Sequence, residues 1–284
     1  MAKYRKILVA IDGSLSSMHA LRESFKFAEA EKCWMTVVSV IPPYLGDLDT
    51  TSVGNVMASM RKPCEDALAE AARLAAQAKI MIRTTCEEGE LHERIVDLSD
   101  AENYDLIVVG RRGHHRLEKA LVGSVTARVI GYSHKDVLVV PKDATVGWQK
   151  ILIATDGSKY SDAATEKAID FAVSYGGELI VLSVVDMPAE FYGESPEAWD
   201  NLVVKARTYL DRAKQKAEAS GIKVQAFIRE AETWQAIIDM ADEKKADTII
   251  MGSHGRTGLR RLLMGSVTEK VIGHAPCPIL VVKN

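Results

Sequence analysis

The chain has 284 residues, of which 47% are hydrophobic and 26% charged, and its formal net charge is −3. This slightly acidic balance gives no indication of the clustered basic surface that nucleic-acid binding requires, and the longest apolar runs have only the length of a strand, too short to span a membrane. No signal-peptide core precedes the first strand-like run, and the four cysteines form no CxxC pair and match no disulfide framework. We therefore expect a cytoplasmic protein in reducing surroundings that binds neither nucleic acid nor membrane.

The first half of the chain predicts an alternation of strands and helices. Residues 44–60 are rich in Gly, Asp, Thr and Ser, and we expect an irregular surface excursion there. The alternation predicts an α/β domain with a five-stranded parallel sheet and flanking helices. Apolar runs and apolar residues at helical spacing place the strands at 6–11, 34–41, 80–85, 105–109 and 137–140, and the helices at 16–30, 64–79, 91–101 and 124–130.

The second half repeats the first. Lys6–Ser14 returns as Lys150–Ser158, and Gly252 follows its counterpart Gly110 by 142 positions. A duplication of this period predicts two tandem domains, at 1–142 and 148–284, with 143–147 as a linker. In the second domain Ser195 and Pro196 are expected to start a helix that Gly221 closes, and later elements are expected at 222–228, 234–244, 248–251 and 279–282.

Each half carries a glycine loop after its fourth strand. In the second half this loop runs from Gly252 through Gly255 to Gly265, where Ser266 is suited to cap the next helix. Glycines let the backbone turn sharply and approach a ligand, and a helix N-terminus offers free N–H groups to an anion. The loop therefore predicts a phosphate site. The alternative is a plain connection from strand to helix whose glycines only serve turns.

Two further features are expected to meet this loop. In a doubly wound sheet, ligands bind beyond the carboxyl ends of the strands, where the strand order reverses. Asp12 and Asp156 end the first strand of each half, and Val40 and Val184 lie at the end of the second strand. The arrangement predicts a pocket with subsites for base, ribose and phosphate. Alternatively, the two aspartates are plain helix caps.

The pattern Gly-x2-Gly-x9-Gly-Ser after the fourth strand, with Asp at the end of the first, resembles the universal stress protein family. The resemblance covers essentially the whole chain as two tandem domains, and it implies doubly wound, Rossmann-like domains of the adenine nucleotide alpha hydrolase-like type. In the family's ATP-binding branch, the glycines and the Ser or Thr hold the phosphates. The aspartate contacts the nucleoside end and helps to place a metal ion such as Mg, and backbone at the end of the second strand holds adenine.

Carried over, the resemblance implies two ATP sites. It also implies that the terminal strands, at 137–140 and 279–282, pair antiparallel so that the two domains form an intramolecular pseudo-dimer, and we further expect a homodimer of chains. The residues implied for the first site are Ala10, Asp12, Val40, Gly110, Gly113, Gly123, Ser124 and Val125. Those implied for the second site are Ala154, Asp156, Val184, Gly252, Gly255, Gly265, Ser266 and Val267.

The two loops differ in sequence. Arg111-Arg112 stands where the second loop has Ser253-His254, and Arg116 stands where it has Gly258. If Gly258 has a positive φ, Arg116 adopts it at a cost of about 1 kcal/mol, so the first loop is expected to be re-shaped. We therefore expect the second domain to be the more regular ATP site. Gly89, matched by Ala231, concerns the entry to the third helix.

Other function classes lack their motifs. Asp12-Gly13-Ser14 is not the G-x-G-x-x-G of a dinucleotide oxidoreductase, and no G-x-x-x-x-G-K-[ST] of a phosphotransferase is present. The pair His114-His115 with His134 suggests a metal site, but no Cys or carboxylate spacing completes a ligand set, and His254 and His274 are expected to be loop and helix-end residues. No catalytic residues are assigned, although slow hydrolysis of bound ATP stays open. The sequence favours an ATP-binding stress-response sensor or adaptor; the alternative is a tandem scaffold that works through protein contacts without nucleotide.

Overall fold

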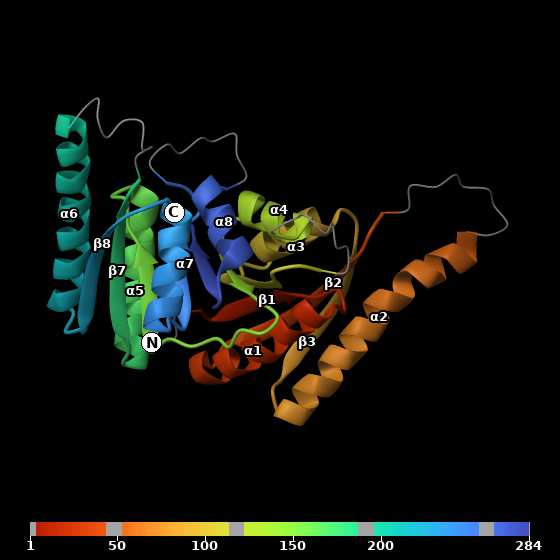
Figure 1. The fold of residues 1–284 in the computed structure, drawn as a ribbon. Helices are drawn as coiled ribbons and strands as arrows, with labels where there is room; N and C mark the ends of the chain where they lie inside the picture. Colours follow the sequence, from red (N-terminus) through yellow and green to blue (C-terminus); the bar gives the residue numbers. More distant parts are fainter. Residues whose placement is uncertain (1–3, 44–52, 114–121, 187–195, 256–263, 284) are drawn as a thin grey trace. The chain divides into compact units, whose positions relative to one another are not determined.

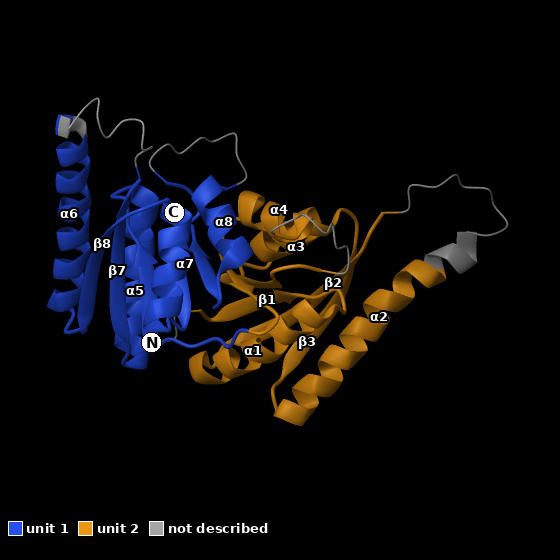
Figure 2. Cartoon of the chain, viewed as in Figure 1, with its two compact units in different colours: residues 1, 144–284 blue, residues 2–143 orange. Residues whose placement is uncertain are grey.

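The computed structural model describes residues 4–43, 53–113, 122–186, 196–255 and 264–283 (Figure 1). The chain divides into two compact units, residues 2–143 and residues 144–284 (Figure 2). Strands and helices alternate in the same order in both units. Each unit is therefore a complete α/β domain in its own right, and the predicted fold class is confirmed.

In the first unit, five parallel strands form a sheet in the order β3-β2-β1-β4-β5. The order reverses between β1 and β4, because the chain first builds outward through β2 and β3 and then returns to the other side of β1. Its elements are β1 (Lys6–Ala10), α1 (Leu15–Glu31), β2 (Trp34–Ile41), α2 (Val53–Ala78), β3 (Ile82–Glu88), α3 (Leu91–Ala101), β4 (Leu106–Gly110), α4 (Ser124–Tyr132) and β5 (Asp136–Val140).

The second unit has the matching order β8-β7-β6-β9-β10, again with parallel pairing throughout its described strands. Ser195, the expected cap of α6, lies outside the described residues, and Gly221 has a φ of +75° two residues after the end of α6. The antiparallel pairing of terminal strands between the units stays a prediction. The elements are β6 (Lys150–Ala154), α5 (Lys159–Tyr175), β7 (Glu178–Val185), α6 (Pro196–Ala219), β8 (Val224–Glu230), α7 (Thr233–Lys244), β9 (Thr248–Gly252), α8 (Ser266–His274) and β10 (Ile279–Val282).

The central strands are apolar on both faces because helices cover both faces of the sheet. Every residue of β4, β5, β9 and β10 is buried. Continuous apolar runs of this kind are typical of parallel strands between two helical layers. Helix α1 contributes Leu21, Phe25 and Ala28 to the core, at the helical spacing that its sequence indicates.

Helix α2 begins at Val53, well before the start at Cys64 that composition suggested, so the expected irregular excursion is wrong for residues 53–60. The apolar residues Val53, Val56 and Met57 stand at i, i+3 and i+4, which is helical spacing. The nearby Gly and Ser and the proline within the helix, Pro63, obscured that signal because these residues usually mark turns.

Both long helices pack through stripes of alanine. Ala67, Ala71 and Ala75 of α2 are buried, as are Ala213 and Ala217 of α6. Small side chains allow each helix to approach its sheet closely, while charged residues cover the opposite face. Among the helices in the described ranges, none combines the length and the continuous apolar character that crossing a bilayer requires.

Cys64 of α2 and Cys86 of β3 form a disulfide, with 6.4 Å between their Cα atoms and 22 positions between them in the sequence. The expectation that the cysteines match no disulfide is therefore wrong for this pair, whereas Cys33 and Cys277 carry free thiols. Spacing along the chain did not reveal the bond, because its two halves meet only when α2 packs on the sheet next to β3.

Candidate functional site

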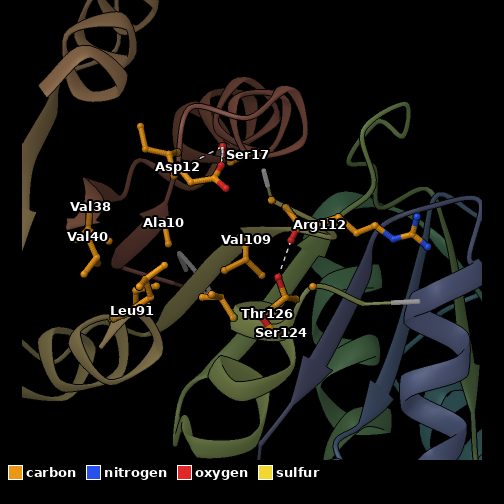
Figure 3. Close-up of a pocket in the computed structure, with 16 residues that line it drawn as sticks. Ala10, Asp12, Ser17, Val38, Val40, Leu91, Val109, Arg112, Ser124 and Thr126 are labelled. Atoms are coloured by element: carbon orange, nitrogen blue, oxygen red, sulfur yellow. Dashed lines mark hydrogen bonds between the residues drawn. The ribbon is translucent and has the colours of Figure 1, made fainter. Parts of the chain in front are cut away.

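Each unit has a cavity at the carboxyl ends of its strands, at the point where the strand order reverses; Figure 3 shows the cavity of the first unit. Every residue that the resemblance assigned to the first site lines the first cavity, and every residue assigned to the second site lines the second. The fold thus brings together the end of the first strand, the end of the second strand and the glycine loop, which are far apart in the sequence.

Asp12 holds the turn between β1 and α1. Its Oδ1 accepts hydrogen bonds from the backbone N–H of Ser14 (3.0 Å) and from the hydroxyl of Ser17 (2.7 Å). Ser14, not Asp12, caps α1, since its hydroxyl oxygen accepts from the backbone N–H of Ser17 at 3.2 Å. The alternative that Asp12 is a plain helix cap is therefore wrong.

Asp156 has the matching place in the second unit. Its Oδ1 accepts from the backbone N–H of Ser158 at 3.0 Å, and Ser158 caps α5 through a 3.2 Å bond from the backbone N–H of Ser161. The cap alternative is therefore wrong for Asp156 as well. In both units the aspartate fixes the strand-to-helix turn with one oxygen, and this orients the carboxylate toward the cavity.

The second glycine of each loop passes close to that carboxylate. A Cβ added at Gly113 would lie 2.3 Å from Asp12 Oδ2, and one added at Gly255 would lie 2.9 Å from Asp156 Oδ2. Both distances are shorter than any normal contact, so a side chain at either position would displace the carboxylate. Glycine here allows backbone and carboxylate to share one corner of the cavity.

The third glycine of each loop is the N-cap of the following helix, and Ser124 and Ser266 are the first residues of α4 and α8. The expectation that Ser266 caps the helix is therefore wrong. Gly265 has a φ of −67°, which any residue can adopt, and an added Cβ would meet its nearest neighbour at 3.5 Å, so the fold of the helix start does not itself require glycine there. Neither α4 nor α8 has a side-chain hydrogen bond at its cap, and the N–H groups of a first helical turn have no acceptor within the helix. This is the arrangement that binds anions.

A threonine in the first turn ties each helix start to its strand. Thr126 donates its hydroxyl to the Gly110 carbonyl at 2.9 Å, and Thr268 donates to the Gly252 carbonyl at 3.1 Å (Figure 3 shows the first). This hydrogen bond joins the end of the strand, where the loop begins, to the first turn of the helix, where the loop ends. It therefore fixes the two ends of the loop next to each other. Sequence reasoning missed these threonines, although Val-Thr follows Gly-Ser in both halves.

Each cavity has an apolar wall at the end of the second strand of its unit. In the first cavity it is made by Val38 and Val40 of β2 with Leu91 and Ile95 of α3. Val38 was missed, although alternation along a strand places it on the same face as Val40. The second unit has the matching wall from Leu182, Val184 and Ile237, with Asp186 beside it; Asp186 accepts from the backbone N–H and the hydroxyl of Thr233, both at 2.9 Å. Each cavity therefore has a polar corner at one end and an apolar slot at the other.

The two cavities differ in size and charge. The first has a volume of about 120 Å³ and the second about 300 Å³. Arg112 lines the first where His254 lines the second; the Nδ1 of His254 lies 3.1 Å from the Ser253 hydroxyl. Burial lowers the pKa of the Arg111 guanidinium, and the positive charge of Arg112 lowers it further. The expected effect of Arg116 and Gly258 falls on residues that the structure does not describe.

The histidines do not assemble a metal site in the described ranges, which contain no cluster of three His, Cys, Asp or Glu residues able to hold an ion. His114 and His115 lie outside those ranges. His274 is the last residue of α8, where its Nδ1 lies 2.8 Å from the Lys270 carbonyl oxygen and its ring lies 4.8 Å from that of Trp234. The expectation that it is a helix-end residue is confirmed.

The model of the universal stress protein family matches the chain twice, over residues 3–141 and 147–283. A universal stress protein of Methanocaldococcus jannaschii is 40% identical over 142 residues, which cover 48% of this chain and 83% of that relative. One from Mycolicibacterium smegmatis is 26% identical over 292 residues and covers 98% of this chain and 96% of its own length. The crystal structure of a universal stress protein from Archaeoglobus fulgidus is similar with a TM-score of 0.75 at 26% identity, covering 98% of this chain and 96% of that one. The chain thus belongs to the universal stress protein family, with two family domains in tandem.

Proposed function

We propose that each unit binds ATP in its cavity and that the protein acts as a nucleotide-dependent sensor or adaptor in the stress response. The observation that carries the proposal is the meeting, in both units, of an uncapped helix N-terminus, a glycine loop and an apolar slot within one cavity. A triphosphate needs N–H donors and positive electrostatic potential, and a base needs an apolar slot with backbone at its rim.

The residues divide between the two ends of the ligand. The loop amides and the first turns of α4 and α8, which begin at Ser124 and Ser266, would hold the phosphates. Backbone at Val40 and Val184 would hold adenine against the apolar wall. Asp12 and Asp156, oriented by their turns, would contact the nucleoside end or a metal ion that accompanies the phosphates.

The described residues of the two cavities favour binding over catalysis. The Ser17 hydroxyl donates to Asp12, and the Ser14 hydroxyl oxygen accepts the N–H of the helix it caps, so both groups maintain the turn. A slow hydrolysis of the bound nucleotide is compatible with the proposal but is not its basis. In a sensor or adaptor, the occupied and the empty cavity would present different surfaces to a partner.

The rival function is a scaffold that works through protein contacts without nucleotide. The two functions are distinguished by the molecule that accompanies the protein through purification. We expect native mass spectrometry of freshly purified full-length chain to show an added mass equal to ATP or a related adenine nucleotide. A chain that carries no nucleotide and binds none when ATP is added in titration calorimetry would favour the scaffold.

We further expect the second site to bind ATP about tenfold more tightly than the first, a difference of about 1.4 kcal/mol. The second cavity is larger, about 300 Å³ against about 120 Å³, and His254 lines it where Arg112 lines the first. An arginine that reaches a phosphate contributes about 1.5–3 kcal/mol, but this gain requires the loop amides to be in place first.

This asymmetry is measured by titration calorimetry in two variants, each with one intact site. Gly123→Val leaves the second site, and Gly265→Val leaves the first. Equal affinities in the two variants, or tighter binding by the first site, would contradict the expected asymmetry.

A further inference from the structure

The Cys64–Cys86 disulfide lies next to the first cavity. Cys86 is exposed on β3, the edge strand, where its register partner on β2 is Ser39. The next residue of β2 is Val40, which lines the cavity. Cys64 is 4% exposed and lies on α2, which runs beside β3 (Figure 1). The bond therefore fastens a helix to the edge strand one residue along the register from Val40, on the face of the sheet opposite to the Val40 side chain.

The second unit shows the same elements without the bond. Ile228 has the place of Cys86, since it pairs with Ser183 as Cys86 pairs with Ser39. Ala206 has the place of Cys64, 142 positions later, and both are buried. The second unit therefore has the same helix and edge strand as the first, but with alanine and isoleucine at the two positions, which cannot form a disulfide.

The helix that lacks the bond forms part of its cavity. Leu202 and Ala206 of α6 line the second cavity, whereas none of the described residues of α2 lines the first. Helix α6 makes two ion pairs with α5 through largely exposed side chains, Arg212 with Asp162 and Lys216 with Glu166, the latter at 3.0 Å.

The described part of helix α2 does not make the ion pair that Arg212 makes from α6. Glu70, which matches Arg212, pairs within α2 with Arg73 at 2.7 Å. Helix α2 is instead linked to β3 by the disulfide and by an exposed pair, Arg61 with Glu88 at 3.7 Å. An exposed pair of this kind holds little by itself, so the disulfide is the stronger of these two links, and it adds to the packing of the buried alanines of α2.

We propose that Cys64 and Cys86 form a thiol–disulfide switch that controls the first site. When the bond is formed, α2 is fastened to β3, and the wall of the cavity contains Leu91 and Ile95 of α3 but no residue from the described part of α2. When the bond is reduced, α2 moves to the place that α6 has in the second unit, completes the wall, and the ligand binds more tightly. The switch rests on the proposed function, because its effect is read at the same ATP site.

The chemistry is ordinary thiol–disulfide exchange with a dithiol reductant. A reductant thiolate attacks the sulfur of the exposed Cys86, the bond to Cys64 breaks, and Cys64 leaves as a thiolate that takes up a proton. The second thiol of the reductant then displaces Cys86 from the mixed disulfide. Two electrons and two protons pass to the pair, and the reductant becomes a disulfide; oxidation by a low-molecular-weight disulfide reverses each step.

The other two cysteines are poorly suited to this exchange. Burial raises the pKa of the Cys33 thiol to about 11 and that of the Cys277 thiol to about 12. Both therefore stay protonated at neutral pH, and the thiolate is the reactive form. A redox effect on the first site is thereby assigned to the pair Cys64 and Cys86.

The test uses the full chain with Gly265→Val, so that ATP titrates the first site alone. We expect dithiothreitol to tighten ATP binding about fivefold compared with the air-oxidised protein, since an added apolar wall buries further ligand surface. Cys64→Ala, which introduces the residue that α6 carries, should show the tighter affinity with or without reductant. Gly123→Val, which leaves the second site, should show no change on reduction. Equal or weaker binding by the reduced first site would overturn the switch.

A readout without ligand separates the switch from the proposed function. Hydrogen exchange measured by mass spectrometry should change on reduction in peptides from residues 58–78 of α2 and not in peptides from residues 200–219 of α6. If neither site binds ATP in any state, the proposed function fails, and this exchange then decides whether reduction releases α2. Unchanged exchange in α2 would overturn the switch whether or not ATP binds.

Discussion

Gly265→Val is expected to abolish ATP binding at the second site while both units stay folded. Gly265 is the N-cap of α8, with φ and ψ of −67° and 145°, a conformation that valine adopts readily. A Cβ there would meet its nearest neighbour, the Cα of His254, at 3.5 Å, which is ordinary contact. The two further methyl carbons of valine would occupy the space in front of the α8 amides, where a phosphate is proposed to bind.

The loss should be large because several contacts fail together. Displacing a phosphate from two N–H donors costs about 3 kcal/mol or more, which is a hundredfold or more in affinity. Titration calorimetry should show the stoichiometry falling from two ATP per chain to one. Gly265→Ala is the matched control: its single methyl fits at ordinary contact distance, so it should keep two sites and weaken binding much less.

The same experiment separates a phosphate site from a plain turn. If the glycine only serves the connection between β9 and α8, valine should affect stability and ATP binding to a similar small degree. Wild-type affinity at both sites in Gly265→Val would therefore contradict the assignment of the loop to the phosphates. Circular dichroism and thermal unfolding of the same variant show whether the fold is retained.

Gly177→Ala is expected to destabilise the second unit by about 3 kcal/mol, the upper end of the usual cost of overpacking. A Cβ at Gly177 would lie 2.2 Å from the carbonyl oxygen of Trp148 and 3.0 Å from that of Gln149. Both neighbours are backbone atoms, held beside the first residues of β7 by the bond from Glu178 N–H to the Gln149 carbonyl at 2.7 Å. The chain must therefore shift along a strand connection and cannot relieve the overlap by turning a side chain.

The adjacent glycine provides the control. Gly176 has a φ of +65° at the C-cap of α5, but a Cβ there would meet nothing within 4 Å. Gly176→Ala should cost only about 1 kcal/mol, the penalty of the left-handed conformation, which Lys32 adopts at the matching place in the first unit. The free energy of unfolding of the second unit is measured for both variants by chemical denaturation, with hydrogen exchange of the β6 amides as the readout. Equal losses would mean that the connection yields to the added methyl. The matching place in the first unit, which makes the same backbone hydrogen bonds, holds Cys33.

Much of the fold and of the candidate site follows from local sequence. Apolar runs bounded by turn residues placed the described strands within a few residues of their observed bounds, because a strand covered on both faces requires a continuous apolar stretch. The repeated glycine spacing predicted the loop in each half, and parallel strand order then placed Asp12, Val40 and Gly113 in one cavity. These features depend on patterns within single elements and on the rule that parallel strands end at one edge.

Sequence reasoning failed where two elements had to be placed against each other. Pro63 and its polar neighbours hid the first turns of α2, because proline, glycine and serine usually mark turns. The cap role of Ser14 was not foreseen and that of Ser266 was misassigned, because a difference of one or two residues in a helix start decides which group caps it. Such a shift depends on the bonds that Asp12 and Thr268 make to the turn and to the strand end.

The sequence by itself determined the duplication, the α/β alternation and the residues that meet at the end of each sheet. These depend on periodicity and chain order, which are one-dimensional properties. Only the tertiary structure decided that Cys64 meets Cys86, that Leu202 reaches the second cavity and that the described part of α2 does not reach the first. The physical reason is that a helix can lie at several positions over a sheet with the same buried face. Contacts between elements, such as the disulfide between α2 and β3 in the first unit, select among those positions.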